Sequence, residues 1–169
     1  MKISSLKDLH KFTNKISEII LPGDYLFLFG EIGVGKTTFA RQLINVFELK
    51  NNIKKSEVLS PTFNILFEYE LKDFIIKHYD LYRLKNEEEI KNLELFEIEE
   101  KNITLIEWPE LIKNKPTNRI DLFFKYASWF SILCSLTRLQ PVMIILLQFL
   151  LLIRMMKKHG LVIMERDLL

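Results

Sequence analysis

The 169-residue sequence predicts an α/β domain with a mixed β-sheet flanked by helices, followed by an atypical apolar C-terminal tail. Three observations support this prediction. Strand-like and amphipathic helical segments alternate at the start, two strand-like segments in the middle are spaced as a hairpin, and the composition changes abruptly after residue 127. We therefore divide the chain into a domain at 1–127 and a leucine-rich tail at 128–169.

The first part of the chain predicts helix, strand and helix in that order. Residues 4–20 have apolar side chains at helical spacing, and Pro22 with Gly23 ends this segment. The apolar strand "YLFLF" follows directly. After a glycine-rich stretch, the amphipathic "TTFARQLINVF" predicts a second helix.

The second part predicts a hairpin and two further strands. "VLSPTFNILFEYEL" is expected to form a short strand, a loop at "SPTF" and a second strand, which pairs with "FIIKHYDLY" as a hairpin. Asn86 and Glu89 resemble a capping box that opens the helical "EEEIKNLEL". A buried strand "ITLIEW", a short helical turn from Pro109 and a final strand "RIDLFFKY" complete the domain.

The tail differs in composition from the rest of the chain. Asparagine occurs ten times before residue 128 and not afterwards, whereas four of the five methionines lie in the tail. Residues 142–153 are intensely apolar but too short for a bilayer span, which needs about 20 residues. Three interpretations remain: a buried helix, a membrane-associated helix followed by the basic "RMMKK", or a segment foreign to this domain, such as a fusion remnant or an out-of-frame ending.

Cysteine usage and charge limit the possible classes of protein. The single Cys134 cannot form an internal disulfide, and the three histidines are too scattered to suggest a zinc site. Without an apolar signal region at the N-terminus, we expect a cytoplasmic protein and no membrane partner. The net charge of +2 is concentrated in the tail, so the domain is not a basic nucleic-acid platform, and we expect any RNA partner to be reached through another protein.

The glycine-rich stretch has the spacing of a phosphate-binding loop. Gly30, four residues, Gly35, Lys36 and Thr37 match the Walker A pattern GxxxxGK[ST], placed as required between a strand and a helix. Lys36 would contact the β and γ phosphates, and the Thr37 hydroxyl would bind Mg²⁺. The alternative is a glycine turn with an unrelated lysine. The pattern predicts a P-loop NTPase-like domain whose nucleotide contacts are Gly30, Glu31, Ile32, Gly33, Val34, Gly35, Lys36, Thr37 and Thr38.

The strand "ITLIEW" resembles a Walker B strand. Its Glu107 occupies the usual aspartate position and would bind the metal or order a water molecule. An ordinary carboxylate at a strand end is the alternative. Trp108 beside it is expected either to pack in the core or to contribute to the site.

The segment "SPTF" and the strand ending in Asp80 supply further candidates. Nucleotide switches often place a threonine against the γ-phosphate, which makes Ser60 and Thr62 candidates, although a simple turn would look the same. Arg83 could contact a phosphate or pair with Glu87. His78 is two residues before Asp80, so by alternation the two side chains would lie on the same face of the strand; a packed histidine is the alternative.

Four motifs together resemble one known family. "GEIGVGKTTFAR", "SPTF", "HYDLYRL" and "LIEWPE", in this order and at these separations, closely resemble the TsaE (YjeE) family of bacterial ATPases of tRNA threonylcarbamoyladenosine modification, from about Ser4 to Tyr126. The resemblance implies ATP and Mg²⁺ as cofactors and the TsaD and TsaB proteins as partners, which transfer threonylcarbamoyl to adenosine in tRNA. It also implies that Thr37 and Glu107 bind Mg²⁺, that "SPTF" is a switch, and that Asp80 and Trp108 are functional.

The sequence departs from the family pattern in two places. The usual "GDLGAGKT" is "GEIGVGKT" here, a conservative change that should preserve the backbone of the loop. Family members also continue past "RIDLFFKY" with strand-like sequence, whereas this chain enters the leucine-rich tail. Loss of that sheet edge would be expected to weaken folding or partner docking.

These features favour an ATPase that drives or resets a tRNA-modifying complex, with Lys36, Asp80 and Glu107 as its catalytic group. No residue is an obvious strong base, so we expect slow turnover that partners accelerate. A nucleotide-gated binding module without essential hydrolysis is an alternative from another class. A small-molecule kinase is also possible, although no arginine-rich lid is evident, and a GTPase is disfavoured because the NKxD pattern is absent.

Overall fold

The computed structural model describes residues 2–93, 95–96, 101–128 and 131–138. These residues belong to a compact unit that extends from Met1 to Leu139. The apolar stretch 142–153, for which we predicted either a buried or a membrane-associated helix, lies outside the described residues. Within the described part of the chain, no helix is long and apolar enough to cross a membrane.

A seven-stranded mixed sheet forms the centre of this unit, with the strand order β1-β7-β6-β2-β5-β4-β3. The neighbours β2/β6, β2/β5 and β4/β5 are parallel, whereas β1/β7, β6/β7 and β3/β4 are antiparallel. This arrangement confirms the predicted mixed sheet and the central hairpin. The strands are β1 (Lys2–Ile3), β2 (Tyr25–Phe29), β3 (Leu66–Glu70), β4 (Ile75–Asp80), β5 (Asn102–Glu107), β6 (Arg119–Ser128) and β7 (Ser131–Arg138).

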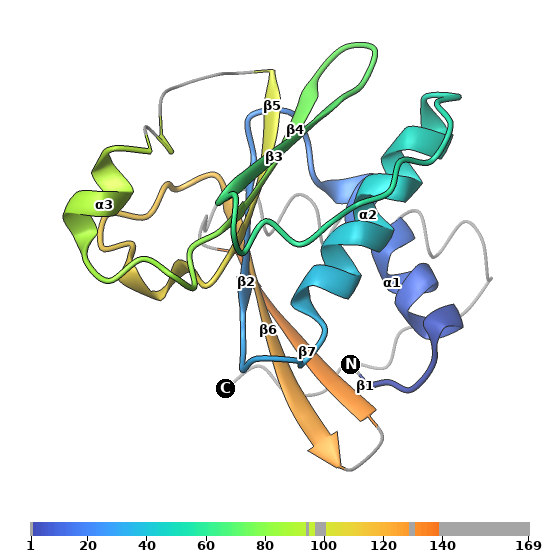
Figure 1. Ribbon diagram of the computed structural model, residues 1–169. Helices are drawn as coiled ribbons and strands as arrows, with labels where there is room; N and C mark the ends of the chain where they lie inside the picture. Colours follow the sequence, from blue (N-terminus) through green and yellow to red (C-terminus); the bar gives the residue numbers. More distant parts are fainter. Residues whose placement is uncertain (1, 94, 97–100, 129–130, 139–169) are drawn as a thin grey trace, which may run out of the picture. The chain divides into compact units, whose positions relative to one another are not determined.

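Helices cover both faces of the sheet. Helices α1 (Leu6–Ile19) and α2 (Lys36–Lys50) lie side by side on one face, and α3 (Glu87–Lys91) lies on the other (Figure 1). A short 3₁₀ helix, η1 (Pro109–Leu111), follows β5.

The two faces of the sheet have separate hydrophobic cores, as expected when side chains alternate along a strand. Leu26 and Leu28 of β2 pack with α1 and α2, and the intervening Phe27 packs in the second cluster with Ile90 of α3. Both faces of β2 are therefore buried, which agrees with its uninterrupted apolar sequence. Burial on both sides fixes the end of β2, where the glycine-rich loop begins.

The structure differs from the sequence-based prediction between α2 and β3. We predicted a short strand at "VL" before "SPTF", but no strand is present among residues 53–65. Instead the Val58 side chain is buried in the core on the α1/α2 face, and its carbonyl accepts a hydrogen bond from Arg41 Nε at 2.8 Å. Because α2 satisfies this backbone group, the segment runs beside the helix and does not join the sheet.

A second difference concerns the C-terminal edge of the sheet. We predicted that "RIDLFFKY" is the last strand, but β6 continues through residue 128 and pairs antiparallel with β7, which lies within the segment predicted as tail. β1 in turn pairs with β7. The expected loss of this sheet edge is therefore wrong, because the start of the tail supplies a strand.

Candidate functional site

The loop between β2 and α2 requires glycine at its first position. Gly30 has a φ of +139°, and a Cβ atom there would lie 2.5 Å from the carbonyl oxygen of Phe124 on the neighbouring strand β6. A side chain would therefore collide with the backbone of the central sheet. Gly35, with a φ of +106°, is the residue at which the loop turns into α2.

The loop leaves the first N–H groups of α2 without partners inside the helix. The first intrahelical hydrogen bond runs from the Phe39 N–H to the Gly35 carbonyl at 2.9 Å, and Gly35 has no side chain to cap the helix. N–H groups at the start of a helix, together with the helix dipole, favour an anion such as phosphate. The backbone of the loop therefore offers free N–H groups that could bind the phosphate we expect there.

The Lys36 side chain folds back over the loop. Its Nζ donates hydrogen bonds to the carbonyls of Gly30 at 2.7 Å and Glu31 at 3.0 Å, and it lies 3.8 Å from the centre of the Trp108 ring. Burial lowers the pKa of Lys36 below its ordinary value, although the charges of Glu107, Glu110 and Asp80 oppose this effect. A phosphate at the loop would offer this desolvated ammonium a stronger, charged partner.

Thr37 and Glu107 meet although they are 70 residues apart in the chain. The Thr37 hydroxyl donates to Glu107 Oε2 at 2.9 Å, while His78 Nε2 lies 2.9 Å from Oε1. The parallel pairing of β2 with β5 places Glu107 opposite Leu28, close to the start of the loop. The geometry therefore brings together the two residues that we predicted to hold a metal ion.

This pair of oxygen ligands suits Mg²⁺ in its chemistry. Mg²⁺ prefers oxygen ligands and usually keeps several water or phosphate ligands beside one or two from the protein. No group of three or more His, Cys, Asp or Glu side chains that could hold a metal occurs in the described residues. A magnesium ion bound by Thr37 and Glu107 would thus complete its shell with nucleotide oxygens and water.

Asp80 connects the "SPTF" segment to the sheet. Its Oδ2 accepts a hydrogen bond from the Thr62 hydroxyl at 2.5 Å, and its Oδ1 accepts one from the Tyr82 N–H at 2.9 Å. The hydroxyls of Ser60 and Thr62 are 2.8 Å apart. Since Asp80 is the register partner of Glu107 on the adjacent strand, this segment is held beside the predicted metal ligands.

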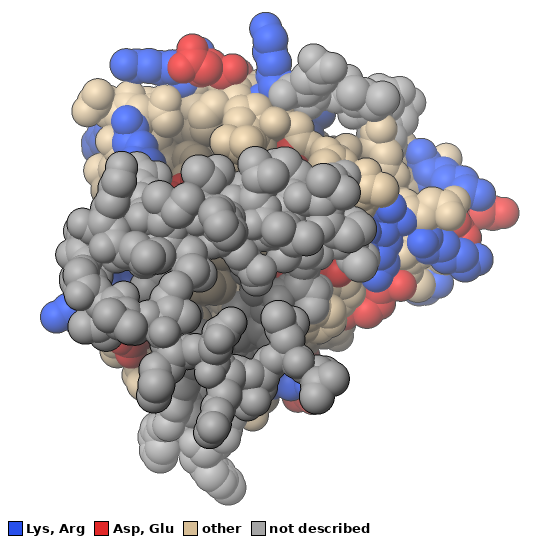
Figure 2. Space-filling view, turned by 180° about the vertical axis from the view of Figure 1, so that it is seen from behind, with Lys and Arg blue, Asp and Glu red and all other residues tan. Residues whose placement is uncertain are grey.

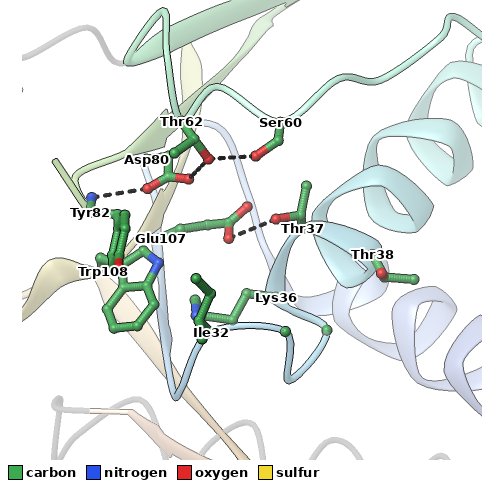
Figure 3. A pocket seen from close by; sticks show the side chains of 12 residues that line it. Ile32, Lys36, Thr37, Thr38, Ser60, Thr62, Asp80, Tyr82, Glu107 and Trp108 are labelled. Carbon is green, nitrogen blue, oxygen red and sulfur yellow. Dashed lines mark hydrogen bonds between the residues drawn. The ribbon is translucent and has the colours of Figure 1, made fainter.

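A cavity of about 260 Å³ unites most of the predicted residues (Figure 3). Of the predicted nucleotide contacts, Gly30, Glu31 and Val34 do not line it; Val34 is buried in the core, and the other two bind Lys36 through their carbonyls. The cavity is lined by Ile32, Gly33, Gly35, Lys36, Thr37, Thr38, Ser60, Thr62, Asp80, Tyr82, Glu107 and Trp108.

Trp108 lines the cavity and also packs against the hydrophobic core on the α3 face of the sheet. Its backbone is left-handed, with φ 58° and ψ 54°, which is rare for a bulky residue and is often found at functional sites. Its ring packs against Tyr82 with centroids 4.8 Å apart. Tyr82 was missing from the predicted site, although its position two residues after Asp80 was the signal that could have suggested it.

Arg83 does not line the cavity. Its guanidinium carbon lies 4.1 Å from the centre of the Phe63 ring, so Arg83 contacts the "SPTF" segment by a cation–π interaction. Of the two alternatives for Arg83, the pairing with Glu87 is not found among the described residues, where Glu87 instead binds Lys113 Nζ at 2.7 Å. Two contacts therefore join residues 60–63 to residues 80–83: Thr62 with Asp80, and Phe63 with Arg83.

The fold and the site define a class of protein. A parallel strand pair, a glycine loop that leads into a helix, and a threonine and a glutamate that converge beside that loop are the features of a P-loop-type nucleotide-binding protein. The crystal structure of Bacillus subtilis YdiB has the same fold, with a TM-score of 0.63 over 95% of each chain at 22% sequence identity.

Sequence comparison identifies the particular family. Residues 3–129 match the family model described as threonylcarbamoyl adenosine biosynthesis protein TsaE. The protein of that name from Rickettsia bellii is 39% identical over 136 residues, which cover 80% of this chain and 92% of that protein. The Rickettsia conorii protein is 40% identical over 112 residues, 66% of this chain and 62% of that one. The chain belongs to the TsaE family, as the four motifs predicted.

Proposed function

We propose that this protein is a Mg²⁺-dependent ATPase that drives or resets the TsaD/TsaB complex during threonylcarbamoyladenosine modification of tRNA. The single observation that carries the ATPase proposal is the contact of 2.9 Å between the Thr37 hydroxyl and the Glu107 carboxylate, at the mouth of a phosphate-binding loop. The printed names of the relatives, which are tRNA threonylcarbamoyladenosine biosynthesis proteins, support the pathway.

The side chains suggest how phosphoryl transfer to water would be assisted. The loop N–H groups would bind the phosphates, and Lys36 would exchange its two loop carbonyls for phosphate oxygens. Thr37 and Glu107 would hold Mg²⁺, which neutralises charge on the phosphates when it is bound. Asp80 has both oxygens engaged by Thr62 and Tyr82, so it would act by holding the "SPTF" segment at the γ-phosphate.

We propose that TsaD and TsaB accelerate hydrolysis at this site. We expect slow hydrolysis by the isolated chain and faster hydrolysis with TsaD and TsaB, because the cavity residues offer positioning and charge but no strong base free of other contacts. In the view from behind, basic and acidic side chains lie next to each other on the described surface (Figure 2). Because no purely basic patch appears on the described part of this face, we expect tRNA to be contacted through the partner proteins. We also expect this function to be carried out in the cytoplasm.

Substitution of Glu107 by Gln tests the proposal. The variant keeps the size of the side chain but removes the negative charge that would bind Mg²⁺, so ATP hydrolysis and tRNA modification with TsaD and TsaB should both be lost. Glu18→Gln is a matched control, since Glu18 is exposed on α1, does not line the cavity and should retain both activities. Hydrolysis by Glu107→Gln at the rate of the unaltered chain would contradict the proposal.

A nucleotide-gated binding module is the second candidate. The two contacts between residues 60–63 and 80–83 favour it, because a segment held at two points beside the phosphate loop can change its position when nucleotide binds. The same Glu107→Gln variant separates the candidates. A binding module would still support tRNA modification after hydrolysis has been abolished.

A further inference from the structure

His78 is a buried polar residue beside the predicted metal ligands. Its side chain is 0% exposed on β4, and its Nε2 lies 2.9 Å from Glu107 Oε1. The register places His78 opposite Leu105 on β5, so the alternation of side chains puts it on the same face as Glu107, two residues further along. The sequence left open whether this histidine was merely packed; the structure places it against a functional carboxylate.

The Glu107 carboxylate is held from both sides. One oxygen, Oε1, faces the His78 ring, and the other, Oε2, accepts the Thr37 hydroxyl at 2.9 Å. Glu107 is only 2% exposed, so these protein groups and not bulk water determine its orientation. With Oε1 occupied by the His78 ring, Oε2 is the oxygen that remains directed to Thr37 and the loop.

The surroundings of the other ring nitrogen of His78, Nδ1, indicate which of the two nitrogens carries the proton. Nδ1 of His78 is buried and has no hydrogen-bond partner among the described residues. A buried N–H without an acceptor costs free energy, whereas a proton on Nε2 forms a hydrogen bond to a carboxylate. The contacts therefore assign a proton to Nε2, which makes His78 a donor to Glu107.

We propose that His78 is a positioning residue for Mg²⁺ binding: its Nε2–H fixes Oε1 of Glu107 and thereby directs Oε2 to the metal beside Thr37. This inference rests on the proposed function, because it assumes that Glu107 binds the metal. Partners that hydrogen-bond a metal-ligating side chain commonly raise metal affinity by fixing the orientation of the ligand. His78 itself would contact neither the nucleotide nor the metal.

Three variants separate positioning from simple packing. His78→Leu removes the donor and keeps an apolar side chain of moderate size, whereas His78→Gln places an amide N–H at about the reach of Nε2. Ile76→Val, at another fully buried position of β4, changes the core without touching Glu107 and serves as the matched control. The measurements are ADP affinity by calorimetry in EDTA and across a Mg²⁺ titration, with thermal unfolding to confirm that each variant folds.

The expected result is a change in the metal dependence of binding alone. His78→Leu should raise the Mg²⁺ concentration for half-maximal enhancement of ADP binding about 10-fold or more, with affinity in EDTA unchanged. His78→Gln and Ile76→Val should stay close to the unaltered chain. The proposal is overturned if His78→Leu and Ile76→Val have the same Mg²⁺ dependence, or if His78→Gln loses as much as His78→Leu in folded protein.

A second measurement tests the hydrogen bond without nucleotide or metal. Long-range ¹H–¹⁵N spectra of the histidine rings should show a proton on Nε2 of His78, and its nitrogen shift should change in Glu107→Gln. A bare Nε2 overturns the inference, even if His78→Leu does not fold. Failure of the unaltered chain to bind ADP under any condition would instead contradict the proposed function, while the spectra would still decide whether His78 donates to Glu107.

Discussion

Substitution of Gly30 by Ala tests whether the loop geometry depends on the absence of a side chain. The new Cβ would lie 2.5 Å from the Phe124 carbonyl oxygen, 3.1 Å from Val34 Cγ1 and 3.2 Å from Phe124 Cβ. Because Phe124 belongs to β6, which pairs with the central strand β2, its carbonyl cannot move without disturbing the sheet. Gly33→Ala is a matched control in the same loop: its Cβ would meet only the Tyr126 hydroxyl, at 3.3 Å, on an exposed side chain.

The two variants should lose different amounts of unfolding free energy, because the new Cβ atoms would meet different neighbouring atoms. Both glycines have positive φ, so alanine at either position should cost about 1–2 kcal/mol of unfolding free energy in backbone strain. At Gly30 the overlap with a fixed backbone should add about 1–3 kcal/mol, the usual cost of overpacking. We therefore expect Gly30→Ala to lose about 2–5 kcal/mol in total and Gly33→Ala about 1–2 kcal/mol.

Urea denaturation of the full chain measures this difference. With a slope of about 1–3 kcal/mol per molar urea, the midpoint of Gly30→Ala should lie about 1 M below that of Gly33→Ala. Gly30→Ala should also bind nucleotide more weakly, because the Gly30 carbonyl that receives Lys36 would shift. If Gly30→Ala is no less stable than Gly33→Ala, the close contact with Phe124 does not constrain the loop and the reasoning is refuted.

Two further predictions concern other parts of the site. Thr62→Val removes the hydroxyl that binds Asp80 at 2.5 Å, so amide hydrogen exchange across residues 60–65 should accelerate. Thr117→Val, at an exposed position, is the control and should leave this exchange unchanged. Equal exchange in both variants would contradict the role of the contact between Thr62 and Asp80. Lys36 has a pKa lowered by burial, so the unfolded chain holds its proton to higher pH than the folded chain. The free energy of unfolding of the unaltered chain, relative to that of Lys36→Met, should therefore rise with pH between the lowered pKa and the ordinary value of 10.5. Urea denaturation at several pH values measures this difference. A difference that does not change with pH would show that Lys36 is not desolvated.

The sequence predicted the parts of the site that depend on local pattern. The glycine spacing located the loop, and the strands β2 and β5 were recognisable because apolar residues follow each other in both with little interruption. Glu107 was predicted from the likeness of "ITLIEW" to a Walker B strand, and its pairing with Thr37 was implied by the family resemblance. The structure adds the reason why the two residues meet: β2 and β5 are parallel, so their C-terminal ends lie at the same edge of the sheet.

The features that the sequence did not reveal depend on which groups meet across the fold. Alternation put His78 on the same face as Asp80, but its contact with Glu107 requires the register of β4 against β5. Val58 is apolar enough for a strand, yet a hydrogen bond from Arg41 of α2 satisfies its carbonyl. The strand β7 lies in a segment whose composition resembles a tail, and only its pairing with β6 shows it to be part of the sheet.

The most direct test of the central claim is a calorimetric titration of the full chain with a non-hydrolysable ATP analogue, with and without Mg²⁺, for the unaltered chain and for Thr37→Val. The account predicts that Mg²⁺ tightens binding to the unaltered chain and that this gain is lost in Thr37→Val, because the hydroxyl that meets Glu107 is gone. Binding that is absent, or that responds to Mg²⁺ equally in both proteins, would contradict a metal site formed by Thr37 and Glu107 beside the phosphate loop.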